Sequence, residues 1–379
     1  MASPPDQLQE NTGKGTATAQ ACKSGSQALY RDVGGVYLNI MYPEQNVLSA
    51  LSYKPLDGDL FVASYPKCGT TWTQHIVYSI LRDGATPTNI MEFMSSSPFL
   101  EFMGAEGARA MPRPGAIKTH LPFNKVPYSA QAKYIYITRN PYDCCVSAYY
   151  HVKNFHSMLF DGTFNKVPYS AQAKYIYITR NPYDCCVSAY YHVKNFHSML
   201  FDGTFDEYFD MFVEGKVDYG DYFAHLLSWY KRRGDSNVLF LTYEELKKDS
   251  RGCVLKMADF IDKQQYGDKL RNQPELLNKV LDSISKDSMR KLYSQLGEWG
   301  KQLANTPVEA LPEAMRSAME TIKQVCAQPI KGDFVRKGIV GDWKNHFSSE
   351  QIARMKELIA ARTAGSDVMD LWKDTDIPR

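Results

Sequence analysis

One stretch of the chain, Ser64 to Gln74, combines residue types that bind anions. Its sequence is SYPKCGTTWTQ, in which Lys67, Thr70 and Thr71 supply one positive charge and two hydroxyl groups beside a glycine. An apolar run precedes it and a helical pattern follows, so the stretch connects a strand to a helix N-terminus. Free backbone N–H groups and the positive end of the helix dipole point at one spot there. The stretch therefore predicts a local anion site.

The order of residues separates this loop from the Walker pattern of nucleotide kinases. In G-x-x-x-x-G-K-[ST] the lysine follows a glycine, whereas Lys67 precedes Gly69 and the upstream glycine is missing. On spacing alone, a plain strand-to-helix turn with a solvated lysine fits equally well. A P-loop-like nucleotide kinase is weakened by this comparison and stays as an alternative.

Strands and helices alternate along the chain. Strands are expected at residues 60–64 (LFVAS), 133–138 (KYIYIT) and 237–243 (NVLFLTY), each followed by a helical pattern. This alternation indicates an α/β fold with a central parallel sheet flanked by helices. In such sheets ligands bind beyond the carboxyl ends of the strands, which is where the anion loop lies.

The composition excludes several classes of protein. The 379 residues include 44 basic and 42 acidic side chains, and this balance does not favour nucleic acid or a membrane surface as a partner. The eight cysteines show no Cys-x-x-Cys and no paired Cys/His ligand spacing, which indicates reduced thiols in the cytoplasm and no metal site. Residues 1–26 lack an apolar core and predict a flexible leader, followed by a single domain over residues 27–379 without a membrane anchor.

A perfect internal repeat lies in the middle of the chain. Residues 123–163 recur without a change as residues 164–204. Solenoid repeats diverge because each unit packs differently, so two identical copies indicate a recent duplication or an error in the gene model. Each copy holds one strand and one helix, and a sheet with fixed neighbours has a place for only one of them, so the other is expected to loop out. The first copy keeps the preceding connection and is synthesised first, and it is favoured for that reason.

Several motifs together resemble the cytosolic sulfotransferase family. YPKCGTTW is close to the family's 5′-phosphosulfate-binding signature, usually written YPKSGTTW. The family's order is kept from about Tyr37 to Trp372 by KTHLP, YITRNPYDCCVSAYYH, VDYGDYFAHLLSWY, VLFLTYEELKKD and FVRKGIVGDWKNHF. The resemblance implies a P-loop-NTPase-like sulfotransferase fold. It also implies transfer of a sulfonate group, without a metal, from 3′-phosphoadenosine 5′-phosphosulfate (PAPS) to a small acceptor.

The resemblance also implies catalytic roles for three residues. His120 matches the family's general base, and an ordinary histidine pKa of about 6.5 leaves the imidazole neutral near neutral pH. Lys67 and Lys118 match the lysines that contact the transferring group and the bridging oxygen. Without the family, His120 would be expected to be a structural histidine and the lysines to be solvated charges.

The donor-binding residues implied by the resemblance fall into three groups. The 5′ end is expected at the loop, the adenine at two aromatic rings, and the 3′-phosphate at a serine and several basic or glycine positions. These are Lys67, Cys68, Gly69, Thr70 and Thr71; Trp72 and Tyr243; and Arg139 and Ser147 or their duplicates Arg180 and Ser188, with Arg336, Lys337 and Gly338.

The chain departs from the family pattern at several positions. Cys68 replaces the usual serine, and a thiol at a helix N-terminus tends to have a lowered pKa, so it is expected to react with alkylating reagents. Lys286 stands where the family commonly has an aromatic residue, and residues 291–333 form a longer connection that is expected to shape a lid. The short dimer motif expected after GDWK is absent, so a homodimer is not inferred.

The sequence specifies neither the acceptor nor whether the chain is active. The segment MEFMSSSPFLEFM, residues 91–103, is expected to be an aromatic-rich loop that suits a phenol or another flat apolar alcohol or amine, although such runs more often form core. Besides the kinase, a donor-binding protein without activity is an alternative, because the repeat could disrupt the sheet.

Overall fold

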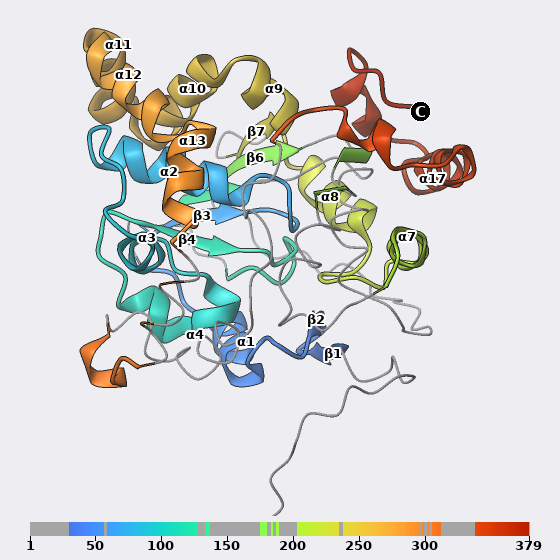
Figure 1. Cartoon of the computed structure of the whole chain (residues 1–379), viewed down its shortest axis with the longest axis horizontal. Coiled ribbons are helices and arrows are strands. Elements are labelled where there is room, and N and C mark those ends of the chain that lie inside the picture. The colour runs from blue at the N-terminus through green and yellow to red at the C-terminus, as the bar shows by residue number, and fades with distance from the viewer. Residues whose placement is uncertain are drawn as a thin grey trace, which may run out of the picture.

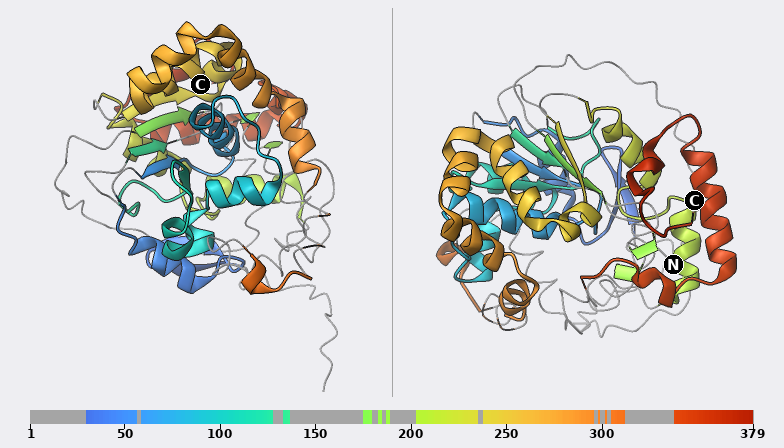
Figure 2. Two further views of the ribbon diagram at one scale, coloured as in Figure 1. Left: turned by 90° about the vertical axis from the view of Figure 1, so that its left-hand side faces the viewer. Right: turned by 90° about the horizontal axis from the view of Figure 1, so that it is seen from above.

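The computed structural model describes most of the chain outside the repeat. The described residues are 30–56, 59–127, 133–136, 175–179, 183–184, 187–188, 203–234, 238–295, 298, 302, 305–311 and 338–378. In Figure 1, strands β3, β4, β6 and β7 lie in the middle, helices α10 to α13 lie together at one corner, and α7, α8 and α17 lie at another side. The views in Figure 2 show the same strands enclosed by helices.

The central strands are parallel, as expected for an α/β fold. β3 pairs on one side with β4 and on the other with β5, and β6 pairs with β7. A separate antiparallel pair, β1 with β2, lies near the start of the described chain. The strands are β1 (Tyr30–Val33), β2 (Val36–Asn39), β3 (Leu60–Ala63), β4 (Ala116–Thr119), β5 (Lys133–Tyr136), β6 (Tyr175–Thr179) and β7 (Val238–Thr242). The three strands expected from the sequence are therefore confirmed, since β3, β5 and β7 each lie within one of the expected ranges.

Helices follow the strands and cover the sheet. They are α1 (Glu44–Leu51), α2 (Thr70–Leu81), α3 (Ile90–Ser96), α4 (Leu100–Arg109), α7 (Phe205–Val213), α8 (Tyr222–Tyr230), α9 (Tyr243–Lys248), α10 (Ser250–Asp262), α11 (Asp268–Asn272), α12 (Pro274–Ser283), α13 (Lys286–Tyr293) and α17 (Ser349–Arg362). A π-helical turn (Lys263–Gly267) joins α10 to α11, and 3₁₀ turns lie at Val308–Ala310, Asp342–Asn345 and Val368–Trp372. The aromatic segment 91–103 belongs largely to α3 and α4 and is therefore helical rather than an open loop. No helix in the described part of the chain is long and apolar enough to cross a bilayer.

Local sequence signals explain several helix starts. At α9 the Thr242 hydroxyl accepts the Glu245 N–H at 3.0 Å, and the Glu245 carboxylate accepts the Thr242 N–H at 2.7 Å. The same reciprocal cap begins α7, between Thr204 and Glu207. Such capping boxes satisfy two otherwise unpaired backbone donors. The strand-to-helix transition expected after the third strand is thus encoded locally.

Both copies of the repeat contribute a strand. β5 comes from the first copy, and its Tyr134 lies opposite Phe61 of β3. β6 comes from the second copy, and its Tyr175, which corresponds to Tyr134, lies opposite Val238 of β7. Most of both copies lies outside the described residues, so the loop-out of one copy stays a prediction.

The second copy is anchored on the C-terminal part of the chain. The Tyr183 ring packs on the Trp343 ring with centroids 4.1 Å apart. The carboxylate of the neighbouring Asp184, which is fully buried, accepts the Trp343 N–H at 2.7 Å and also the Gly341 N–H. The corresponding residues of the first copy lie outside the described residues. These contacts fix the start of the second copy's helix beside the segment that follows Gly338.

Candidate active site

The anion loop makes a left-handed turn into α2. Lys67 has φ 66° and Gly69 has φ 106°, a conformation that glycine adopts without strain. Gly69 is the N-cap residue, and its carbonyl accepts the Thr73 N–H at 3.1 Å. Within the described part of the chain no side chain caps this helix, and its first turn holds no acidic residue. The helix start therefore keeps the polarity that suits an anion.

Ser64 joins this loop to the neighbouring strand end. Its hydroxyl lies 2.5 Å from the Thr70 hydroxyl and 3.2 Å from Nδ1 of His120. Its backbone N–H donates to the Thr119 carbonyl at 3.2 Å, because β3 and β4 are parallel and in register at Ala63 and Thr119. The carboxyl ends of these two strands thus bring the loop and His120 together.

The environment of His120 fixes its tautomer and its charge. Nδ1 lies 2.8 Å from the Ser64 carbonyl oxygen, which can only accept, so Nδ1 carries the proton and Nε2 carries the lone pair. The side chain is buried. Burial, and after it the positive charge of Lys118, hold the pKa of His120 well below its ordinary value. A neutral imidazole with a basic Nε2 can accept a proton.

Lys118 is held close to His120 by the same strand. Its Nζ lies 4.1 Å from the centre of the Phe99 ring. Burial lowers the pKa of Lys118 to about 8, and the carboxyl group of Glu101 opposes that shift. The charge of Lys67 also acts on His120. The structure therefore places Lys118 beside His120, and Lys67 lies in the loop that Ser64 joins to His120.

Aromatic rings and a buried carboxyl group surround His120. The rings of Phe99 and Tyr219 lie 5.2 Å and 5.5 Å from the His120 ring, both in edge-to-face contact. Oε1 of Glu101 accepts the His120 backbone N–H at 2.6 Å and the Tyr219 hydroxyl at 3.1 Å. The sequence did not single out Ser64, Glu101 or Tyr219. The position of Ser64 could have been recognised, because it directly follows β3, and β3 is parallel to β4, which ends before His120.

A second group of expected residues meets beyond β7. The Trp72 and Tyr243 rings are in edge-to-face contact with centroids 5.6 Å apart, and Nζ of Lys247 lies 4.7 Å from the Trp72 ring. Gly338 has φ 62°, and a Cβ atom placed there would lie 3.7 Å from Nζ of Lys247 and 4.0 Å from Cδ of Lys286. Both residues expected at the adenine thus lie near one residue expected at the 3′-phosphate.

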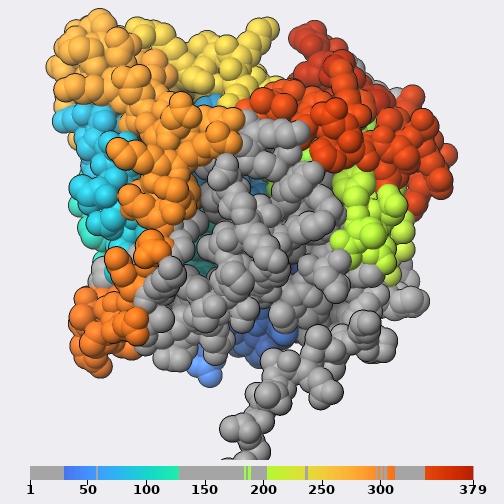
Figure 3. Space-filling model, viewed as in Figure 1, coloured from blue at the N-terminus to red at the C-terminus, as the bar shows by residue number. Residues whose placement is uncertain are grey.

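Trp72 is held in place by contacts between α2 and the end of α12, two segments that are far apart in the sequence. Nε1 of Trp72 donates to the Ile284 carbonyl at 3.1 Å, and the Ser283 hydroxyl donates to the Ser79 hydroxyl at 2.7 Å. In the space-filling view, the orange segment of α12 and α13 lies against the light-blue segment of α2 and α3 (Figure 3).

The remaining residues that the sequence assigned to donor binding include one buried thiol, one half-buried serine and several positions outside the described residues. Cys68 is fully buried. Alkylation requires an accessible thiol, so this burial does not favour the expected reaction with alkylating reagents. Ser188 is half-buried at the start of the second copy's helix. Five residues lie outside the described part of the chain, and their contacts are not tested: Arg139, Ser147, Arg180, Arg336 and Lys337. Among the described residues, no group of three His, Cys, Asp or Glu side chains could hold a metal ion.

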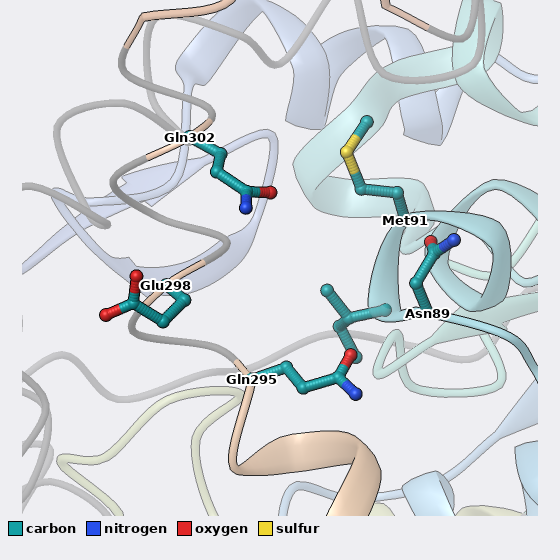
Figure 4. Close-up of a pocket in the computed structure, with 6 residues that line it drawn as sticks. Asn89, Met91, Gln295, Glu298 and Gln302 are labelled. Atoms are coloured by element: carbon teal, nitrogen blue, oxygen red, sulfur yellow. The ribbon is translucent and has the colours of Figure 1, made fainter.

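One open pocket lies away from these residues. It has a volume of about 490 Å³ and is lined by Asn89, Ile90, Met91, Gln295, Glu298 and Gln302. Figure 4 shows Gln295 and Gln302 approaching it from the side opposite Asn89 and Met91. Met91 belongs to the aromatic segment 91–103, and Gln295, Glu298 and Gln302 belong to the connection 291–333 that was expected to shape a lid. None of the expected catalytic or donor-binding residues lines the pocket, so it is not assigned to the chemistry of His120.

Comparison with known proteins identifies the family. The family model for the sulfotransferase domain matches residues 57–170 and 164–367, and the two ranges overlap where the second repeat copy begins. The chain belongs to the sulfotransferase family. Among curated sulfotransferases, it is 30% identical to rabbit (Oryctolagus cuniculus) sulfotransferase 1C2, over 92% of this chain and 98% of that one. The human sulfotransferase 1C2 is 28% identical over 91% of this chain and 96% of that one.

Solved structures show the sulfotransferase fold independently. Mouse sulfotransferase SULT7A1 complexed with PAP has a TM-score of 0.57 and 23% identity, over 91% of this chain and 98% of that one. Retinol dehydratase in complex with androsterone and the inactive cofactor PAP also has a TM-score of 0.57, with 19% identity over 88% of each chain. The α/β fold expected from the sequence is thus confirmed as that of a sulfotransferase.

Proposed function

We propose that this sulfotransferase transfers a sulfonate group from PAPS to a hydroxyl or amine of a small phenolic or alcohol acceptor, with His120 as general base. The observation that supports this best is the 2.8 Å contact between His120 Nδ1 and the Ser64 carbonyl, which leaves Nε2 as the basic atom. The acceptor O–H or N–H would give its proton to Nε2, and its oxygen or nitrogen would attack sulfur. The bond between sulfur and the bridging oxygen would break, and its electron pair would stay with the leaving 5′-phosphate.

Two lysines would hold the charge that develops on the leaving group. Lys67 lies in the loop at the start of α2, and Lys118 lies on β4, which ends directly before His120. Positive groups fixed in a buried site stabilise such charge without reorganising solvent. The backbone N–H groups at the start of α2, with the Thr70 and Thr71 hydroxyls, would bind the 5′ end of the donor.

The names of related proteins support the donor and the type of acceptor. The SULT7A1 and retinol dehydratase structures contain PAP, and the latter also contains androsterone. A rabbit amine sulfotransferase is 27% identical over 84% of this chain and 85% of that one.

The aromatic surroundings of His120 support a flat apolar acceptor. Tyr42 is in edge-to-face contact with Phe99, Phe102 and Tyr219, with ring centroids 5.9, 6.4 and 6.2 Å apart. Rings of this kind give a large apolar contact area with few polar groups. A phenol or an alicyclic alcohol fits this chemistry better than a sugar.

The other end of the donor is assigned to the second group of residues. We place the adenine at Trp72 and Tyr243 and the 3′-phosphate at Arg336, Lys337 and Gly338. The anchoring of Tyr183 and Asp184 beside Trp343 favours the second repeat copy, with Arg180 and Ser188, as the further partner. This differs from the preference for the first copy that chain order suggested.

Radiolabelled PAPS, offered with a panel of phenols, alcohols and amines, tests the proposed function. Sulfonated product should form equally with and without a metal chelator. Transfer from ATP that the chelator abolishes would favour the kinase instead. Tight PAP binding without any product from the panel would favour the inactive donor-binding protein.

A further inference from the structure

Glu101 occupies an unusual position for a carboxyl group. It lies on α4 and is fully buried, although carboxylates are rarely buried unless they are paired. Its Oε1 accepts two hydrogen bonds, one from the His120 backbone N–H at 2.6 Å and one from the Tyr219 hydroxyl at 3.1 Å. The first of these bonds holds the residue that carries the proposed base.

The groups that face Glu101 come from several elements. Lys118 is on β4 and His120 directly follows it, Tyr219 precedes α8, and Tyr42 lies between β2 and α1. Among these groups Lys118 is the cation, and the negative charge of Glu101 favours its protonated form. Glu101 is therefore coupled to His120 by a hydrogen bond and to Lys118 by charge.

We propose that Glu101 is a positioning residue for sulfonate transfer: it fixes the His120 backbone and, when ionised, keeps Lys118 protonated. This rests on the proposed function of His120 and Lys118. Glu101 acts through these two residues and does not itself touch the reacting atoms.

The proposal makes the role of Glu101 depend on pH. Burial raises the pKa of Glu101 to about 7, while that of Lys118 is lowered to about 8. Well below pH 7 Glu101 is neutral and Lys118 is charged in any case. Replacing the Glu101 carboxyl group therefore does not change the charge of Lys118 at this pH. Above pH 7 Glu101 becomes ionised and supports the charge of Lys118 where it would otherwise be lost.

Glu101→Gln tests this role, because glutamine keeps an oxygen acceptor for the His120 N–H and cannot ionise. The variant should match wild-type turnover within about twofold near pH 6 and fall at least about threefold below it near pH 8, because Lys118 loses its proton at lower pH. Glu106→Gln is the matched control on the same helix, since Glu106 is exposed, and it should follow the wild-type profile. An equal loss at every pH, or no loss at any pH, overturns the proposal.

Infrared difference spectra between about pH 6 and pH 8 provide a test that needs no turnover. Wild type should show the carbonyl band of a protonated carboxyl that disappears as pH rises, and Glu101→Gln should lack it. If Glu101→Gln does not fold, Tyr219→Phe replaces it: it removes a hydrogen bond that lowers the pKa of Glu101, so the band should persist to higher pH. Absence of a Glu101 band near pH 7 overturns the proposal, whereas failure of wild type to sulfonate any acceptor contradicts the proposed function instead.

Discussion

The carbonyl oxygen of Ser64 lies 2.8 Å from Nδ1 of His120, across the ends of two adjacent parallel strands. A backbone carbonyl cannot donate, so this contact selects the imidazole tautomer whose Nε2 is basic. It also ties the proposed base to the residue that begins the anion loop.

His120→Ala should reduce turnover by about 10²- to 10⁴-fold, because it removes the group that accepts the acceptor's proton. PAP binding, measured by calorimetry, should change little, since the base acts on the acceptor rather than on the donor. Near-full turnover in this variant would remove His120 from the role of base.

Ser64→Ala should leave turnover within about tenfold of wild type, because the carbonyl that orients His120 belongs to the backbone. The variant loses the hydroxyl contact with Thr70, so its free energy of unfolding should fall by about 0.5 to 1.5 kcal/mol. Denaturant unfolding and steady-state rates measure both effects. A loss of turnover as large as that of His120→Ala would show that the hydroxyl, and not the carbonyl, orients the ring.

The pH profile should reflect two lowered pKa values. The neutral imidazole is the active form, and the pKa of His120 is depressed, so activity should be lost only as pH falls well below about 6.5. The protonated form of Lys118 is the active one, so activity should decline as pH rises through about 8. Rates from acid to alkaline pH measure both limbs, and an acid limb above the ordinary histidine value would contradict the assignment.

Lys118→Arg should remove the alkaline limb, because a guanidinium keeps its charge far above pH 8. Overall turnover should fall, since arginine places its charge differently from lysine. The shape of the profile is the relevant readout. An alkaline limb that remains near pH 8 in this variant would mean that another group causes it.

Asp184→Ala should lower the free energy of unfolding by about 1.5 to 3 kcal/mol, because two backbone N–H groups lose a charged acceptor. Asp143 is the corresponding residue of the first copy, so Asp143→Ala is a control in an identical sequence context. It should have little effect if the second copy alone is anchored beside Trp343. Equal destabilisation by both variants would mean that the copies exchange places.

Arg180→Ala should weaken PAP binding by about 1.5 to 3 kcal/mol, the contribution of a hydrogen bond to a charged group. Arg139→Ala should be nearly silent, because the contacts of Tyr183 and Asp184 favour the second copy. The reverse pattern would assign the 3′-phosphate to the first copy, in agreement with the preference from chain order.

The sequence by itself determined the features that neighbouring residues encode. The loop from Lys67 to Trp72, the strand before it and the helix after it are specified by a contiguous run of residues. The capped start of α9 is specified in the same way by Thr242 and Glu245. The alternation of such units predicted a parallel α/β sheet. The strand that carries Lys118 and ends directly before His120, β4, was not among the strands predicted from the sequence.

Only the tertiary structure decided which distant side chains meet. Glu101 contacts residues 19 and 118 positions away, and Ser64 contacts His120 56 positions away. No local pattern specifies such pairs, because they depend on how α4, β3 and β4 pack. The repeat shows the same limit: two identical segments have identical local propensities, so β5 and β6 differ only through the strands beside them, β3 and β7.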